Sequence, residues 1–205
     1  MKREHPVATC PITVKPKIEL AGKCVVLRPL RPLDAEELYE AARESIAAVG
    51  PWLPWCHANY SFDDAFSYLE SRLQAWNDGV EYSFGVFENS SARFLGGVGI
   101  NFIDWISRRG NLGYWIRSSA VGQGYASDAA RSLAKWGLSE LNLQRIEIVA
   151  AVGNIASQRA AEKAGAKREA ILRNRCRIGE VAHDAVVFSF IPDDFNVRPA
   201  HVEAR

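Results

Sequence analysis

The spacing of hydrophobic and polar positions predicts strands and helices along most of the chain. Hydrophobic runs bounded by turn residues predict strands, and apolar residues that recur every three or four positions predict helices. The predicted strands span residues 24–30, 82–88, 94–104, 110–117, 145–152, 167–173 and 184–191. The predicted helices span residues 33–42, 61–76, 124–140 and 154–164.

Two helix starts carry the spacing of a capping box, in which two side chains three residues apart each bond the backbone amide of the other residue. Asp34 and Glu37 have this spacing at the first helix, and Ser61 and Asp64 have it at the second. The second helix is also expected to have one apolar face, made by Phe62, Phe66, Leu69, Leu73 and Trp76.

The order of these elements predicts the fold class. Three consecutive strands with short links, within residues 82–117, imply an antiparallel meander. We therefore expect an α+β fold with a mixed, mostly antiparallel sheet of six to seven strands and helices on both faces. Residues 1–20 are interrupted by prolines and are expected to form a flexible arm. Residues 21–197 are expected to form a single domain, followed by a tail at residues 198–205.

Composition narrows the classes of partner. The 205 residues are 48% hydrophobic and 24% charged, with a net charge of +1, so neither nucleic acid nor an anionic membrane surface is an expected partner. No apolar run reaches the roughly 20 residues of a membrane span, and a cytoplasmic location is expected by default. The four cysteines form no CxxC pair, so we expect free thiols and no metal site.

A glycine-bearing turn is the first candidate for chemistry. Gly122 and Gly124 stand directly before the helix predicted at residues 124–140. The unpaired amides of a first helical turn form a natural anion site, and glycine lets a ligand approach them closely. The amides from Gly122 to Ser127, with the Ser127 hydroxyl, could therefore hold a phosphate. The alternative is a turn that only links a strand to a helix.

Several motifs in order resemble the GNAT family, the GCN5-related N-acetyltransferases, and within it the ribosomal-protein branch of RimJ/RimL type. "GYWI", "GQGYASDAA", "N-x-x-S-x-x-x-x-E-K-x-G" and "EAILR" follow one another between about residues 24 and 195. The family's Q/R-x-x-G-x-G/A motif corresponds to residues 121–126, with Val121 in place of Gln or Arg. The resemblance implies a GNAT fold, whose sheet contains a splayed central pair of parallel strands.

The resemblance also implies a binding site for acetyl-CoA. It places the diphosphate on the glycine turn and the thioester arm along the strand before it, where an amide near Ile116 would bind the acetyl oxygen. The resemblance to RimL-type enzymes places Ser157 beside the sulfur, and Ser157 is the remaining hydroxyl because Ala161 occupies the position of the tyrosine found in many relatives. Asn154 could also simply cap the following helix. The implied acetyl-CoA residues are Trp115, Ile116, Arg117, Gly122, Gln123, Gly124, Tyr125, Ala126, Ser127, Asn154 and Ser157, with Ser157 and Ile116 as the catalytic candidates.

The general base is left open. In RimL-type enzymes a glutamate has this role, but the corresponding position here falls at or near Cys176. A chain of water molecules is one alternative. The other candidates are Asp104, Glu81, Glu180 and Asp184.

The acceptor site is expected near an aromatic loop. Trp52 and Trp55 lie in "GPWLPWCHANY" and, together with Asn101, are the predicted substrate-binding residues; packing into the core is the alternative. Three alternating arginines, Arg173, Arg175 and Arg177, would share one face of an extended strand and could bind acidic groups.

These observations together predict an acetyl-CoA-dependent N-acetyltransferase that modifies a primary amine, with the N-terminal α-amine of a protein as the first choice of acceptor. A small-molecule amine is the second choice. A non-catalytic acyl-CoA-binding module of the same fold is the alternative from another class. The enzyme is expected to be a monomer or a homodimer, with no metal.

Overall fold

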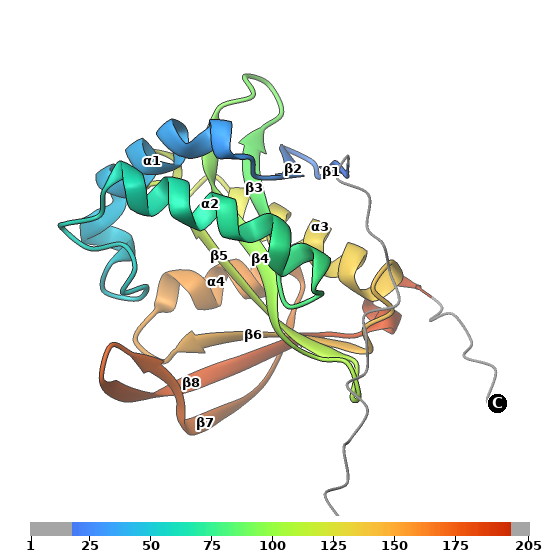
Figure 1. The fold of residues 1–205 in the computed structure, drawn as a ribbon. Helices are drawn as coiled ribbons and strands as arrows, with labels where there is room; N and C mark the ends of the chain where they lie inside the picture. Colours follow the sequence, from blue (N-terminus) through green and yellow to red (C-terminus); the bar gives the residue numbers. More distant parts are fainter. Residues whose placement is uncertain (1–17, 198–205) are drawn as a thin grey trace, which may run out of the picture.

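The computed structural model describes residues 18–197, which form one open sheet flanked by helices (Figure 1). The sheet order is β1-β2-β3-β4-β5-β6-β8-β7. Most of the predicted arm and the whole predicted tail lie outside the described residues. The strands are β1 (Leu20–Ala21), β2 (Val25–Pro29), β3 (Tyr82–Glu88), β4 (Phe94–Asp104), β5 (Arg109–Ile116), β6 (Arg145–Ala151), β7 (Lys167–Ile178) and β8 (Val181–Phe190). The helices are α1 (Ala35–Val49), α2 (Phe62–Asn77), α3 (Tyr125–Ser139) and α4 (Ile155–Ala164).

The predicted fold class is confirmed, with one more strand than expected. Strands β3, β4 and β5 form the antiparallel meander. The described residues contain eight strands rather than six or seven, because β1 was not predicted. It is only two residues long, too short to show alternation, and it pairs with β2 through Leu20 and Leu27.

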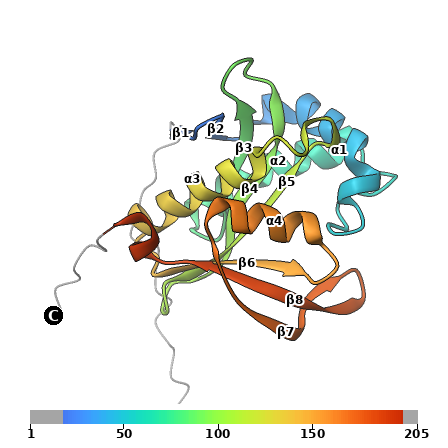
Figure 2. The same ribbon diagram turned by 180° about the vertical axis from the view of Figure 1, so that it is seen from behind.

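The two central parallel strands separate, as the resemblance implies. Strand β5 pairs with β6 only from Arg109 to Asn111, opposite Arg145 to Glu147. Beyond that point β6 continues beside β8, whereas β5 stays beside β4. Figure 2 shows the two strands diverging, with α4 drawn in front of β5 and above β6. The last five residues of β5 therefore have no neighbouring strand on their β6 side.

Helices cover both faces of the sheet. Helices α1 and α2 lie on one face, and α3 and α4 on the other (Figures 1 and 2). Leu133, Ala134 and Leu138 of α3 are fully buried in the larger core cluster, and burial of one leucine side chain contributes about 1.5–3 kcal/mol. The smaller cluster packs α1 and α2 against the ends of β3 and β4. The sheet is thus fixed on both sides of the point where β5 and β6 part.

The two predicted capping boxes differ in outcome. At α2 the box is confirmed: the Asp64 amide donates to Ser61 Oγ at 3.2 Å, and the Ser61 amide donates to Asp64 Oδ2 at 2.8 Å. At α1 the prediction is wrong. Asp34 instead accepts from the Arg31 amide at 2.7 Å and pairs with the Arg28 guanidinium at 2.7 Å. Because Arg28 on β2 binds the Asp34 carboxylate, this carboxylate makes no capping hydrogen bond to α1.

The predicted apolar face of α2 is only partly correct. Leu69 and Trp76 are buried, but Phe62, Phe66 and Leu73 remain 41%, 36% and 64% exposed. The inner side of the helix is turned toward the sheet through Ala65 and Leu69, so the rest of the predicted stripe faces outward.

Candidate functional site

The glycine turn presents open main chain at the start of α3. Gly122 and Gly124 have φ of +83° and +88°, a conformation that L side chains rarely adopt. A Cβ built on either glycine meets nothing within 4 Å, so the space above the turn is free. Gly124 is the N-cap, and no side chain caps the helix there. The first amides of α3 are therefore left without helical partners beside an open space, which is the geometry of an anion site.

The side chains of this turn mostly face elsewhere. Tyr125 is buried and its hydroxyl donates to the Glu88 carboxylate on β3. Ser127, whose hydroxyl was a predicted donor, is also buried, with 9% of its surface exposed. Gln123 is exposed and Ala126 is partly buried. The donors that the exposed part of the turn offers are thus main-chain amides and the side chain of Gln123.

Asp128, the first charged residue of α3, has a structural partner. Its carboxylate accepts from the amides of Lys23, Cys24 and Val25 at 3.0, 2.8 and 3.2 Å. These bonds hold the turn between β1 and β2 against α3 and hold the pKa of Asp128 below its usual value, although burial opposes them. The charge is thereby kept away from the glycine turn.

The end of β5 presents one predicted backbone donor toward the opening between β5 and β6. The Arg117 amide donates to Leu95 O on the β4 side at 2.7 Å, so it is not available to a ligand. Because successive peptide groups of a strand point to opposite edges, the Trp115 amide also faces β4, and the Ile116 amide faces the opening. Of the three predicted contacts on this strand, the Ile116 amide is the one with suitable geometry.

Two hydroxyl groups meet at the same opening, Ser157 from the start of α4 and Tyr114 from β5. Asn154 caps the helix, because its Oδ1 accepts from the Ser157 amide at 3.1 Å. Tyr114 on β5 reaches across and donates to the Ser157 carbonyl at 2.7 Å, with its oxygen also 3.3 Å from Ser157 Oγ. Burial raises the pKa of Tyr114 to about 12. Tyr114 was not among the predicted site residues. Strand alternation puts it on the same face of β5 as Ile116, which could have suggested it.

The aromatic loop between α1 and α2 contacts both sides of the opening. Trp55 packs edge-on against Trp115 of β5, with ring centroids 5.3 Å apart. Trp52 lies against Gly153 in the turn between β6 and α4, where a Cβ would approach its ring within 3.4 Å. Neither tryptophan is fully buried, whereas Cys56 and Tyr60 of the same loop are. Cys56 and Tyr60 of the loop therefore belong to the core, whereas Trp52 and Trp55 form a wall beside the opening.

Part of β4 and β5, called the floor below, lies on the face covered by α1 and α2. Strand register puts Asn101, Asn111 and Gly113 on this face together with Trp115. Asn111 Nδ2 donates to Asn101 Oδ1 at 2.9 Å, and a Cβ on Gly113 would meet nothing within 4 Å. Asn101, predicted to bind substrate, thus lies on the same face as the aromatic loop.

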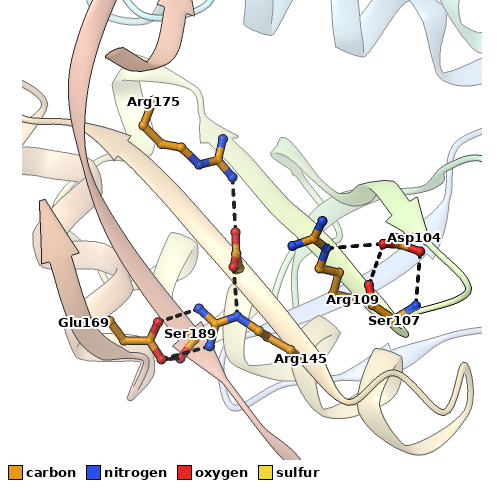
Figure 3. Close-up of polar contacts among 8 residues, drawn as sticks. Asp104, Ser107, Arg109, Arg145, Glu169, Arg175 and Ser189 are labelled. Atoms are coloured by element: carbon orange, nitrogen blue, oxygen red, sulfur yellow. Dashed lines mark hydrogen bonds and ion pairs between the residues drawn. The ribbon is translucent and has the colours of Figure 1, made fainter. Parts of the chain in front are cut away.

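Each acidic candidate for the general base already has a partner. Asp104 accepts from Ser107 and its amide, which lowers its pKa, and pairs with Arg109 at 3.5 Å (Figure 3). The others are paired as follows: Glu81 with Arg72 and Ser83, Glu180 with Arg177, and Asp184 with the Asn174 amide. Each carboxylate therefore contributes to local structure.

Cys176 and its neighbouring arginines do not form the predicted arrangement. Burial raises the pKa of the Cys176 thiol, which disfavours the thiolate a nucleophile would need. A register shift between Leu172 and Cys176, with Asn174 at a φ of +50°, interrupts the alternation expected of the three arginines. Arg175 instead binds Glu147 of β6 at 3.2 Å.

A polar network joins three strands below the opening. Arg145 lies between Glu169 and Ser189 on one side and the Glu147 carboxylate on the other, with Arg145 Nε 2.8 Å from Glu147 Oε1 (Figure 3). Glu147 is the last β6 residue paired with β5. The network therefore ties β6, β7 and β8 together where the divergence begins.

The described part of the chain has neither a cluster of metal-binding side chains nor a helix that could span a membrane. Residues 18–197 contain no group of three or more His, Cys, Asp and Glu side chains that could hold a metal ion. Within the same residues, no helix has the length and apolar character needed to cross a membrane.

Comparison with known proteins gives one consistent match. Residues 25–167 match the Acetyltransferase (GNAT) domain. YdaF of Bacillus subtilis (strain 168), provisionally named a ribosomal N-acetyltransferase, is 30% identical over 173 residues that cover 82% of this chain and 91% of YdaF. A Vibrio cholerae structure, provisionally described as a ribosomal-protein-serine acetyltransferase, has a TM-score of 0.77 at 31% identity and covers 87% of this chain and 100% of its own. Mycobacterium smegmatis RimJ, in complex with CoA-disulfide, has a TM-score of 0.78 at 20% identity over 90% of each chain.

Proposed function

Because the chain belongs to the GNAT acetyltransferase family, we propose that it transfers the acetyl group of acetyl-CoA to the N-terminal α-amine of a protein. The observation that carries this proposal is the divergence of β5 and β6 after three residue pairs, next to open main chain at the start of α3. A thioester arm needs such an opening in the sheet, and its diphosphate needs such a turn. Here both lie at the same end of β5.

The coenzyme would be held mainly by main chain. The amides that follow Gly122 and Gly124 would bind the diphosphate, helped by the positive end of the α3 dipole. The Ile116 amide would donate to the acetyl oxygen and stabilise the negative charge that develops there in the tetrahedral intermediate. Val121, in place of the family's Gln or Arg, removes a side chain from this set but no amide.

The acceptor would approach from the opposite face of the sheet. The floor around Gly113 and the wall formed by Trp52 and Trp55 leave this side open next to β5. An extended peptide terminus could lie along this floor over Gly113, which has no side chain. Asn101 and Asn111 offer amide groups that could bond its main chain.

The paired carboxylates favour an α-amine over a lysine or a polyamine. The amine must attack as the neutral base, so it has to lose a proton first. Each acidic candidate that could take this proton is already bonded to another group. An α-amine, with a pKa of about 7.7–8.0, is roughly 10–20% neutral at pH 7, whereas a lysine amine is less than about 0.1% neutral. An α-amine therefore needs the least help from the enzyme, and water can carry its proton away.

Support for a protein acceptor also comes from the relatives, since YdaF and the Vibrio cholerae protein both carry ribosomal-protein names. The test is thiol release from acetyl-CoA with three sets of amines: peptides with a free N-terminus, the same peptides with a blocked N-terminus and a free lysine, and small amines. We expect turnover with the first set only. Turnover restricted to small amines would refute the choice of acceptor, and tight acetyl-CoA binding without any turnover would favour a non-catalytic module.

A further inference from the structure

Tyr114 lies where β5 has left β6 and connects the two sides of that opening. It is three residues beyond Asn111, the last residue of β5 paired with β6. Its hydroxyl is 2.7 Å from the carbonyl of Ser157, in the first turn of α4, and 3.3 Å from Ser157 Oγ. The contact therefore links the free part of β5 to the helix on the other side of the opening.

The number of available protons decides the direction of these bonds. The phenol of Tyr114 has one proton, and a carbonyl oxygen can only accept, so Tyr114 donates to Ser157 O. In the contact at 3.3 Å the Ser157 hydroxyl must then be the donor and Tyr114 the acceptor. In the free protein, Tyr114 thus holds the main chain of Ser157 in place and accepts from its hydroxyl.

The acidity of Tyr114 argues against a role as proton donor. Burial raises the pKa of Tyr114 to about 12, although the contact with Ser157 opposes this. A thiol has an ordinary pKa of about 8.5, so proton transfer from such a phenol to a leaving thiolate is unfavourable. The phenol instead stays protonated across the working range of pH and keeps its bond to Ser157.

We infer that Tyr114 is a positioning residue that holds the Ser157 hydroxyl at the opening, ready to turn and donate to the sulfur of a bound thioester. This inference rests on the proposed function. Ala161, at the position where many relatives carry a tyrosine, is fully buried and has no hydroxyl. Ser157 is thus the hydroxyl that remains on α4, and Tyr114 orients it from β5. Asn154 holds the same residue by accepting a hydrogen bond from the Ser157 backbone amide.

The test separates an orienting role from simple packing. Calorimetry with coenzyme A and with desulfo-coenzyme A measures whether Ser157 contacts the sulfur, and it needs no acceptor. Wild-type protein should bind coenzyme A more tightly, and both Ser157→Ala and Tyr114→Phe should reduce that preference. Tyr68→Phe is the matched control, because it removes a phenol 3.4 Å from another serine hydroxyl, on the opposite face of the sheet. It should keep the wild-type preference.

Kinetics provide the second measurement. Loss of one orienting hydrogen bond should lower kcat about fivefold to tenfold in Tyr114→Phe while changing the KM for acetyl-CoA less. The double variant should be no slower than Ser157→Ala alone, because Tyr114 acts through that serine. Thermal unfolding reports whether each variant is folded.

Three results would overturn the inference: wild-type protein that binds both ligands equally, a Tyr114→Phe variant with wild-type preference and kcat, or additive effects in the double variant. Failure of the proposed function is distinguishable from these. In that case wild-type protein releases no thiol with any amine, while the comparison of coenzyme A with its desulfo analogue still tests Tyr114.

Discussion

Replacement of Gly124 by alanine tests the main-chain binding site most directly. Gly124 has a φ of +88°, and a Cβ there would meet no protein atom within 4 Å. The substitution therefore adds backbone strain and one methyl group in the space assigned to the diphosphate. The strain should cost about 1 kcal/mol of folding free energy, which lowers Tm by about 2–4 °C in a domain of this size.

The effect on binding should exceed the effect on stability. A methyl group that prevents close approach removes at least one charge-assisted hydrogen bond, worth about 1.5–3 kcal/mol, so the Kd for coenzyme A should rise about tenfold to a hundredfold. Calorimetry measures the Kd and a thermal scan measures Tm.

Gly179 supplies the matched control for this experiment. It has a φ of +56°, a Cβ there also meets nothing within 4 Å, and it lies in the turn between β7 and β8. Gly179→Ala should thus add similar strain and leave the Kd for coenzyme A unchanged. Unchanged affinity in Gly124→Ala, or equal loss of affinity in both variants, would refute the argument.

Three further changes probe the acceptor wall, a helix cap and an ion pair. Trp55→Ala should raise the KM for the amine about fivefold or more and leave the Kd for coenzyme A unchanged, whereas His57→Ala in the same loop should change neither; equal effects would contradict the assigned wall. Ser61→Ala should lower the free energy of unfolding by about 1 kcal/mol in chemical denaturation, because it removes the cap of α2. The hydrogen bond from Arg117 lowers the pKa of Glu44 from 4.5 to about 2, so its contribution to stability is present above pH 4.5 and is lost as the pH falls toward 2. Glu44→Gln should therefore make Tm less dependent on pH across that window, and an unchanged slope would contradict this.

Much of the fold could be predicted because its signals are local. The capping box at α2 and the short links of the meander each depend on neighbouring residues. The failures involve partners distant in sequence or space. Asp34 resembles a helix cap until Arg28 on β2 is known to bind it. Exposure of Phe62 depends on which side of α2 faces the sheet, and periodicity alone cannot give that.

The candidate site divides in the same way. Gly122 and Gly124 could be identified because positive φ favours glycine, and therefore leaves a mark in the sequence. Strand alternation shows only that Tyr114 shares a face with Ile116; its contact with Ser157, 43 residues away, could not be predicted from local sequence. Its orienting role is visible only when the opening between β5 and β6 brings the two together.

The two faces of the sheet explain why the coenzyme is easier to infer than the acceptor. On the face covered by α3 and α4, the proposed binding of the coenzyme depends on main-chain amides whose positions follow from the fold and from two glycines. On the other face, binding of the acceptor would depend on side chains such as Trp52 and Trp55, from a loop that contacts Trp115 of β5 and Gly153 after β6. Loops tolerate substitution far better than a sheet does, so the acceptor wall can change while the coenzyme side stays intact. We therefore expect a few loop side chains to determine which amine is accepted, and variants of this loop should change the KM of the acceptor independently of coenzyme affinity.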